Sequence, residues 1–256
     1  MPVVLVHGNP ETAAVWEDLI PLLDADEVIA LSPPGFGAPV PAGFGATAGE
    51  YVAWLAGELQ QIAGPIDLVG HDWGAGHVMG LVNVAPHLVR SWVSDIAGAL
   101  DPEYVWHDMA QAWQTPEVGE AAVAAMVNAP LEVRSGIFIA NGARPELAEK
   151  LAAGIDAEMG RCLLPLYRSA AQPVMAEFGA DLGGLASTPG LVIIATEDHF
   201  TGGEALARRT AERAGAQVAV LEGLGHWWML QDPAAGAAAL NAFWATLEPG
   251  EAATVN

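Results

Sequence analysis

Short, largely apolar runs recur along most of the chain, with amphipathic segments between them. Six such runs have the character of strands buried on both faces of a parallel sheet. They cover residues 3–6, 27–31, 66–69, 92–96, 191–195 and 217–221. Apolar residues at helical spacing lie between them, as at 12–23 and 51–62. This alternation predicts an α/β protein with a mostly parallel sheet of about six strands flanked by helices.

The alternation stops between residues 99 and 186. This segment is helical in pattern and rich in Trp, Met and Ala, with breaks at Pro and Gly. We therefore expect a core built from residues 1–98 and 187–256. Residues 99–186 would form a helical cap inserted between two strands of the sheet.

The composition narrows the range of partners. With 256 residues, of which 52% are hydrophobic, the chain can bury a sizeable core. Its formal net charge is −22, and only nine residues are Lys or Arg. Such a charge disfavours binding to nucleic acid or to an anionic membrane, and it favours a neutral substrate over an anionic one.

The chain contains a single cysteine, Cys162, so it cannot form an internal disulfide. This is typical of a reducing compartment, and we interpret Cys162 as a small packed apolar residue. The N-terminus lacks the basic segment of a signal peptide, and no apolar run is long enough to span a bilayer. These features predict a cytoplasmic protein and leave its oligomeric state open.

One segment carries the pattern of a reactive turn. An apolar strand ends at Val69, the sequence Gly-His-Asp-Trp-Gly follows at 70–74, and helical spacing resumes from Val78. Small residues on both sides of Asp72 allow a strand and a helix to approach closely, which exposes the central side chain at a sharp corner. A carboxylate at this corner suits attack on a saturated carbon that bears a leaving group. The alternative is a solvated Asp in a glycine-rich turn.

This segment resembles the nucleophile elbow of the epoxide hydrolases and haloalkane dehalogenases, which share the α/β-hydrolase fold. The resemblance extends over most of the chain and implies that Asp72 forms an ester with the substrate, which water then hydrolyses. The first strand begins at Val3, so the two strands that precede it in that fold are missing from this sequence. We expect a reduced sheet.

The turn at 7–10, His-Gly-Asn-Pro, resembles the oxyanion turn of the same families. Haloalkane dehalogenases with this motif hold the departing halide with the Asn side chain and the Trp after the nucleophile. The resemblance thus implies a halide site formed by Asn9 and Trp73, since two N–H donors suit a desolvated anion. Alternatively, Asn9 only accommodates the backbone of the turn.

The resemblance also implies a catalytic His and a carboxylate that orients it. His226 lies in Gly-His-Trp, followed by Asp232-Pro233, as in the His loop of epoxide hydrolases. Asp198 follows the fifth predicted strand, at the usual position of the acid, and the order Asp72, Asp198, His226 fits the fold. Asp95 is the alternative acid, because its surroundings resemble those of the acid in fluoroacetate dehalogenases. Asp95 could equally cap the first cap helix.

In the cap, Leu-Tyr-Arg at 166–168 resembles a motif whose Tyr protonates the epoxide oxygen, which implies this role for Tyr167. Met109 occupies the position at which epoxide hydrolases usually carry a second Tyr. We also expect Trp106 and Trp113 to contact the substrate from the cap. The alternative is that Tyr167 only packs the cap.

Taken together, the residues predict a hydrolase that acts on a small neutral organic substrate with water. Because Asn9 and Trp73 are both present and one Tyr is missing, we favour a haloalkane dehalogenase-like reaction over an epoxide hydrolase. A non-catalytic small-molecule binder with the same fold is a third hypothesis. Gly-x-Ser-x-Gly is absent, and so are metal-binding spacings of His or Cys, so neither a serine esterase nor a metal or other cofactor is predicted.

Overall fold

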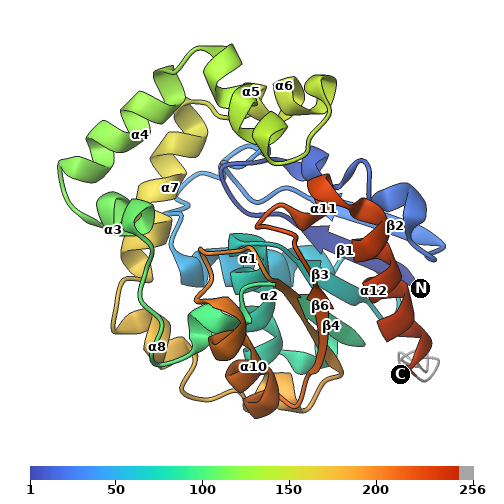
Figure 1. The fold of residues 1–256 in the computed structure, drawn as a ribbon. Helices are drawn as coiled ribbons and strands as arrows, with labels where there is room; N and C mark the ends of the chain where they lie inside the picture. The colour runs from blue at the N-terminus through green and yellow to red at the C-terminus, as the bar shows by residue number, and fades with distance from the viewer. Residues whose placement is uncertain (248–256) are drawn as a thin grey trace.

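The computed structural model describes residues 1–247 and contains a six-stranded sheet in the order β2-β1-β3-β4-β5-β6 (Figure 1). All neighbouring strands are parallel. The strands are β1 (Pro2–Val6), β2 (Glu27–Leu31), β3 (Asp67–Gly70), β4 (Ser91–Ser94), β5 (Gly190–Ala195) and β6 (Gln217–Leu221). The predicted α/β-hydrolase fold class is therefore confirmed, and each apolar run overlaps a strand.

The central strands are buried on both faces, which explains why their sequences are largely apolar. Every residue of β3, β4 and β5 is buried, whereas β2 and β6, at the edges, are partly exposed. Helices α1 (Ala48–Leu59) and α2 (Trp73–Val84) pack against each other on one face of the sheet. On the other face, α12 (Pro233–Ala245) packs against β6 and against the 3-10 turn η2 (Ile20–Leu22). Helices α10 (Gly203–Arg213) and α11 (Trp228–Gln231) and the turn η3 (Pro86–Leu88) complete the core.

The helix predicted at 12–23 is wrong. The segment instead forms two short 3-10 turns, η1 (Ala13–Trp16) and η2 (Ile20–Leu22). Pro21 lies at the start of η2, where its missing N–H prevents a continuous α-helix. The apolar spacing reflected burial rather than helix, because Trp16 and Leu19 are fully buried in the core.

Between β4 and β5 the chain forms a helical insertion, which lies over the carboxyl edge of the sheet in Figure 1. Its elements are η4 (Ala97–Leu100), α3 (Asp108–Gln114), α4 (Val118–Asn128), α5 (Leu131–Ala140), α6 (Pro145–Ala153), α7 (Ala157–Ser169), α8 (Val174–Phe178) and α9 (Gly183–Ala186). Arg144 and Lys150 pair with Glu17, which ties α6 to the core. The last two helices of the insertion pack elsewhere: α8 packs against η4, and α9 packs against α2 of the core.

Within residues 1–247, no single helix is long and apolar enough to cross a membrane. Helices α4 and α5 reach that length and composition only together, as a pair bent by 94°.

The turn between β3 and α2 depends on glycine at a very close approach. A Cβ atom at Gly74 would lie 2.1 Å from the carbonyl oxygen of Val6 in β1, and one at Gly70 would lie 2.3 Å from Cα of Ala75. Both obstacles are backbone atoms, so neither can move aside as a side chain does. Close packing of α2 against β1 therefore requires Gly74, and its close packing against β3 requires Gly70.

We predict that Gly74→Ala lowers the free energy of unfolding by at least about 2 kcal/mol, because the added methyl group overpacks a rigid backbone contact. The matched control is Gly57→Ala in α1, where a Cβ would meet nothing within 4 Å. That change should raise stability by about 0.5–1 kcal/mol, since Ala is the better helix former. Urea unfolding of both variants measures this, and equal stabilities would contradict the predicted close approach.

Candidate active site

Asp72 stands at the corner between β3 and α2, with φ 49° and ψ −128°. A positive φ is uncommon for a residue with a side chain and stores strain of about 1–3 kcal/mol. The carboxylate points toward the turn after β1: a Cβ at Gly8 would lie 2.2 Å from its Oδ1 atom, and the backbone N–H of Asn9 donates to the same atom at 3.0 Å. The predicted elbow is thus formed, with one carboxylate oxygen fixed by a backbone donor.

His226 connects Asp72 to a second carboxylate. Its Nδ1 atom lies 2.8 Å from Oδ2 of Asp198, and its Nε2 atom lies 3.6 Å from Oδ2 of Asp72. Asp198 also accepts a hydrogen bond from the backbone N–H of Phe200 at 2.8 Å. Because the ionised carboxylate accepts, the proton of a neutral His226 resides on Nδ1 and leaves Nε2 free to take a proton beside Asp72. The structure brings these three predicted residues together.

The pKa values of this pair follow from burial and charge. Burial opposes the charged form of His226, but the charge of Asp198 and the hydrogen bond to it outweigh burial, and the pKa of His226 is raised. His71, whose ring centroid lies 4.7 Å from that of His226, lowers this pKa, and Asp72 raises it. Burial also opposes ionisation of Asp198, but His226 and the Phe200 N–H outweigh it and lower the pKa of Asp198.

Asp95, the alternative acid, has a different set of partners. Its Oδ2 atom accepts from Nδ1 of His71 at 2.6 Å and from Nε1 of Trp228 at 2.8 Å. Its Oδ1 atom accepts from the backbone N–H of Asp72 at 3.1 Å. Asp95 therefore holds the backbone and side chain of the elbow through Asp72 N–H and His71, and it has no hydrogen bond to His226. It does not cap the first cap helix, because α3 is capped by His107.

A second buried carboxylate, Glu11, escaped the sequence analysis. It accepts from the backbone N–H of Gly8 at 3.1 Å and from Nε1 of Trp227 at 2.5 Å, and its Oε1 lies 3.5 Å from Nε2 of His71. Burial raises the pKa of Glu11. Burial also opposes a charge on His71, but the two carboxylates outweigh it and raise the pKa of His71 to about 10. Only the tertiary structure reveals this cluster, because an acid after the turn at 7–10 carries no pattern of its own.

The side-chain amide of Asn9 has no hydrogen-bond partner within the described part of the chain, although the residue is only 5% exposed. It lines a cavity of about 40 Å³ together with Asp72, His226 and Tyr167. Trp73 lines an adjoining cavity of about 20 Å³ that also contains Asp72 and Tyr167. The two predicted halide ligands thus each line a cavity beside Asp72.

The predicted cap residues gather over the nucleophile. Tyr167 in α7 contacts the rings of Trp73, Trp106 and Trp113 at centroid distances of 5.3, 5.6 and 4.7 Å. Burial and the charge of Asp72 raise the pKa of Tyr167 well above its ordinary value. Met109, at the position of the missing Tyr, is 47% exposed at the rim of the larger catalytic cavity.

Two further residues of the insertion, Tyr104 and His107, line the cavities that contain Asp72. The hydroxyl of Tyr104 donates to the carbonyl of Phe200 at 2.8 Å, so its proton is already engaged. His107, which the sequence analysis did not single out, lines both catalytic cavities. Its Nδ1 accepts from the N–H of Ala110 at 3.3 Å, and burial lowers its pKa, so a neutral ring carries its proton on Nε2. The only sequence signal for His107 is its place before a helix.

The site contains no arrangement suited to a metal ion. No group of three or more His, Cys, Asp or Glu side chains among residues 1–247 could hold one.

Comparison with known proteins places the chain in a family. Residues 3–239 match the model of the alpha/beta hydrolase family, so the chain belongs to it. No curated protein sequence matches the chain significantly.

Crystal structures of several hydrolases share the fold. The haloalkane dehalogenase DbeA from Bradyrhizobium elkani is 20% identical with a TM-score of 0.71, and the match covers 95% of this chain and 89% of that one. Epoxide hydrolase A from Mycobacterium thermoresistibile is 24% identical with a TM-score of 0.71 and coverages of 97% and 92%. E-2-(acetamidomethylene)succinate hydrolase is 18% identical, with a TM-score of 0.70 and coverages of 96% and 92%. At these identities the likeness defines the fold and leaves the reaction to the site.

We predict different effects for the two candidate acids. Asp198→Asn should lower the pKa of His226, because burial then acts without the opposing carboxylate, whereas His71 and Asp72 remain beside the ring. Asp95→Asn should leave His226 paired with Asp198 but lower the free energy of unfolding by about 3 kcal/mol, since His71 loses its partner in the interior. NMR titration of the His226 ring and urea unfolding measure the two effects. The reverse pattern would make Asp95 the acid.

Proposed function

We propose that this protein hydrolyses small neutral organic molecules through a covalent ester on Asp72. The observation that carries the proposal is the alignment of Asp72, His226 and Asp198, with one oxygen of Asp72 held by Asn9 N–H and the other facing Nε2 of His226. Apart from Asp72 and the His side chains, no residue that lines the two catalytic cavities can carry a charge near neutral pH. Neutral substrates fit this lining.

In the first step, Oδ2 of Asp72 attacks a saturated carbon, a C–O bond forms, and the bond to the leaving atom breaks with its electron pair. The oxygen held by Asn9 becomes the carbonyl oxygen of the ester. Asp72 needs no proton transfer to react, because it is already an anion.

In the second step, His226 takes a proton from water through Nε2, and the hydroxide attacks the ester carbon. Negative charge then develops on the carbonyl oxygen, where the Asn9 N–H stabilises it. The bond then breaks between the ester carbonyl carbon and the oxygen that carries the substrate's alkyl group. His226 returns its proton to that oxygen to form the alcohol, and the re-formed carboxyl group of Asp72 releases its remaining proton. Asp198 fixes the imidazole tautomer and stabilises the imidazolium.

The leaving group decides the reaction class, and we favour halide. The unpartnered amide of Asn9 supports this choice, because a buried N–H donor without a partner is costly unless a ligand accepts from it. Release of a halide from a haloalkane also needs no proton donor on the cap, because the halide leaves as an anion.

An epoxide is the second candidate. The phenol of Tyr167, buried over Asp72 and kept protonated by its raised pKa, supports it. Ring opening leaves an alkoxide attached to the substrate, which this phenol could protonate.

The first test is trapping of the ester. In His226→Gln, attack by Asp72 should survive while hydrolysis stalls, so mass spectrometry should find the substrate's alkyl group on the Asp72 peptide. His199→Gln, at a ring whose side chain is 82% exposed, is the control and should turn over normally. If no adduct forms with a substrate that the wild type converts, the covalent mechanism is wrong; binding without turnover would identify a binder instead.

The second test ranks the donors. For a dehalogenase, Asn9→Ala and Trp73→Phe should each slow halide release by about 10²–10³-fold, whereas Tyr167→Phe should be mild. Tyr104→Phe is the hydroxyl-deletion control, because the Phe200 carbonyl already occupies that hydroxyl. Halide release from bromoalkanes and diol formation from epoxides are measured in parallel. A large loss only in Tyr167→Phe, with diol as the product, would favour the epoxide reaction.

A further inference from the structure

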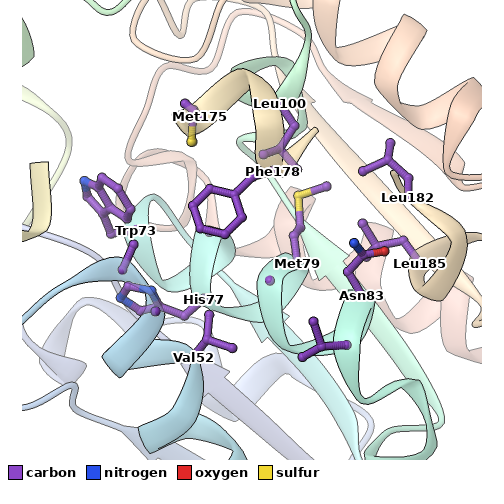
Figure 2. Close-up of a pocket in the computed structure, with 15 residues that line it drawn as sticks. Val52, Trp73, His77, Met79, Asn83, Leu100, Met175, Phe178, Leu182 and Leu185 are labelled. Atoms are coloured by element: carbon purple, nitrogen blue, oxygen red, sulfur yellow. The ribbon is translucent and has the colours of Figure 1, made fainter. Parts of the chain in front are cut away.

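A larger pocket, shown in Figure 2, is lined by Trp73 but not by Asp72. It holds about 260 Å³, compared with about 20 and 40 Å³ for the two cavities that contain Asp72. The catalytic cavities are therefore too small for more than the reacting atoms of a substrate. The pocket lies between α1, α2 and the segment that contains α8 and α9.

Its lining is apolar and uncharged. No Asp, Glu, Lys or Arg lies among the lining residues within the described chain. The face of α2 is hollowed at Gly76 and Gly80; a Cβ at Gly80 would already lie 2.7 Å from Cγ2 of Val52. The amide of Asn83 is satisfied by the Asp181 carbonyl at 2.7 Å and the Gly184 N–H at 3.1 Å. Nothing in these walls favours a charged ligand.

The pocket shares a wall with the catalytic cavity. Trp73 and Met175 line both, and both are buried. In Figure 2 these two side chains stand at one end of the pocket, beside Phe178, and Leu182 and Leu185 stand at the other. From Trp73 to the exposed Val84, α2 runs for about 16 Å. This shape suits a slender alkyl chain, and the flexible side chain of Met175 lines both this pocket and the cavity that contains Asp72.

One polar side chain faces this space without a partner. His77 is 2% exposed and lines the pocket, and no residue of the described chain forms a hydrogen bond with its ring. The ring stacks on Tyr51 at a centroid distance of 4.8 Å. Burial lowers the pKa of His77 to about 3, so the ring is neutral and offers one donor and one acceptor. Its ring nitrogens keep contact with the open space of the pocket, where a polar atom of a ligand can reach them.

We propose that this pocket receives an uncharged, mainly alkyl chain attached to the carbon that Asp72 attacks, and that His77 lies beside this chain and pairs with a polar atom where the chain carries one. The inference rests on the proposed function and adds the substrate class: elongated neutral molecules with the reactive carbon at one end. The chain passes beside Trp73 after Met175 changes rotamer.

Chain-length dependence tests the proposal. Each buried methylene should raise kcat/KM by roughly fourfold, so the five additional methylenes of 1-bromooctane set an upper limit of about 10³ over 1-bromopropane. We expect a preference of at least about tenfold, and the same for the matching terminal epoxides. Val52→Phe narrows the pocket and should reduce this ratio by about tenfold. Leu182→Phe narrows it from another wall and should act alike if the first variant does not fold. Val133→Phe, the same exchange at an exposed cap position, should leave the ratio unchanged.

A binding measurement separates this inference from the chemistry. Octan-1-ol should bind Asp72→Asn protein more tightly than propan-1-ol, shift the ring resonances of His77 but not of the exposed His199, and bind more weakly when Val52→Phe is added. Equal binding of the two alcohols, or equal rate ratios in Val52→Phe and Val133→Phe, would overturn the pocket assignment. Failure of the proposed function looks different, since no ester on Asp72 would then form with either chain length.

Discussion

The site depends on the close approach of the elbow to β1. Gly74 packs against the Val6 carbonyl, and Asp72 adopts a positive φ at the corner. This backbone places the carboxylate against the turn after β1, where the Asn9 N–H fixes one of its oxygens. The strain persists because β3, the strand before the corner, is buried and is paired with β1 on one side and β4 on the other. The surrounding structure therefore determines the conformation of the corner.

Buried ionisable side chains connect three loops around this corner: the turn after β1, the elbow and the loop that carries His226. Asp95 joins the elbow to Trp228, and Glu11 joins the turn after β1 to Trp227, with His71 between the two carboxylates. Both tryptophans directly follow His226, so the loop that carries His226 is hydrogen-bonded through Asp95 and Glu11 to both turns around Asp72. Each carboxylate accepts at least two hydrogen bonds, which offset part of its desolvation, although burial still raises the pKa of Glu11. The same network places a cation beside His226 that opposes its protonation, while Asp198 favours it.

The cap decides what reaches these groups. A cluster of aromatic rings around Tyr167 leaves only small cavities over Asp72, while the open space lies behind Trp73. The predicted halide donors, Asn9 and Trp73, come from the core, and the predicted proton donor, Tyr167, comes from the cap. Asn9 and Trp73 line different cavities beside Asp72, and Tyr167 lines both. The two proposed reactions share Asp72, His226 and Asp198. They differ in the atom that gains negative charge, which is a halide that departs or an oxygen that stays attached to the substrate.

From the sequence alone, local apolar spacing predicted the six strands, and the glycines that a close turn requires predicted the elbow at Asp72. Resemblance to known families pointed to the loop at His226. The sequence did not determine the conformation of residues 12–23, where burial imitated a helical pattern. Asp95 and Asp198 remained alternatives because both follow strands whose carboxyl ends meet at one edge; tertiary structure distinguished them by pairing Asp95 with His71 and Asp198 with His226. Glu11, His107 and the pocket behind Trp73 likewise emerged only from folding, since they join residues far apart in the chain.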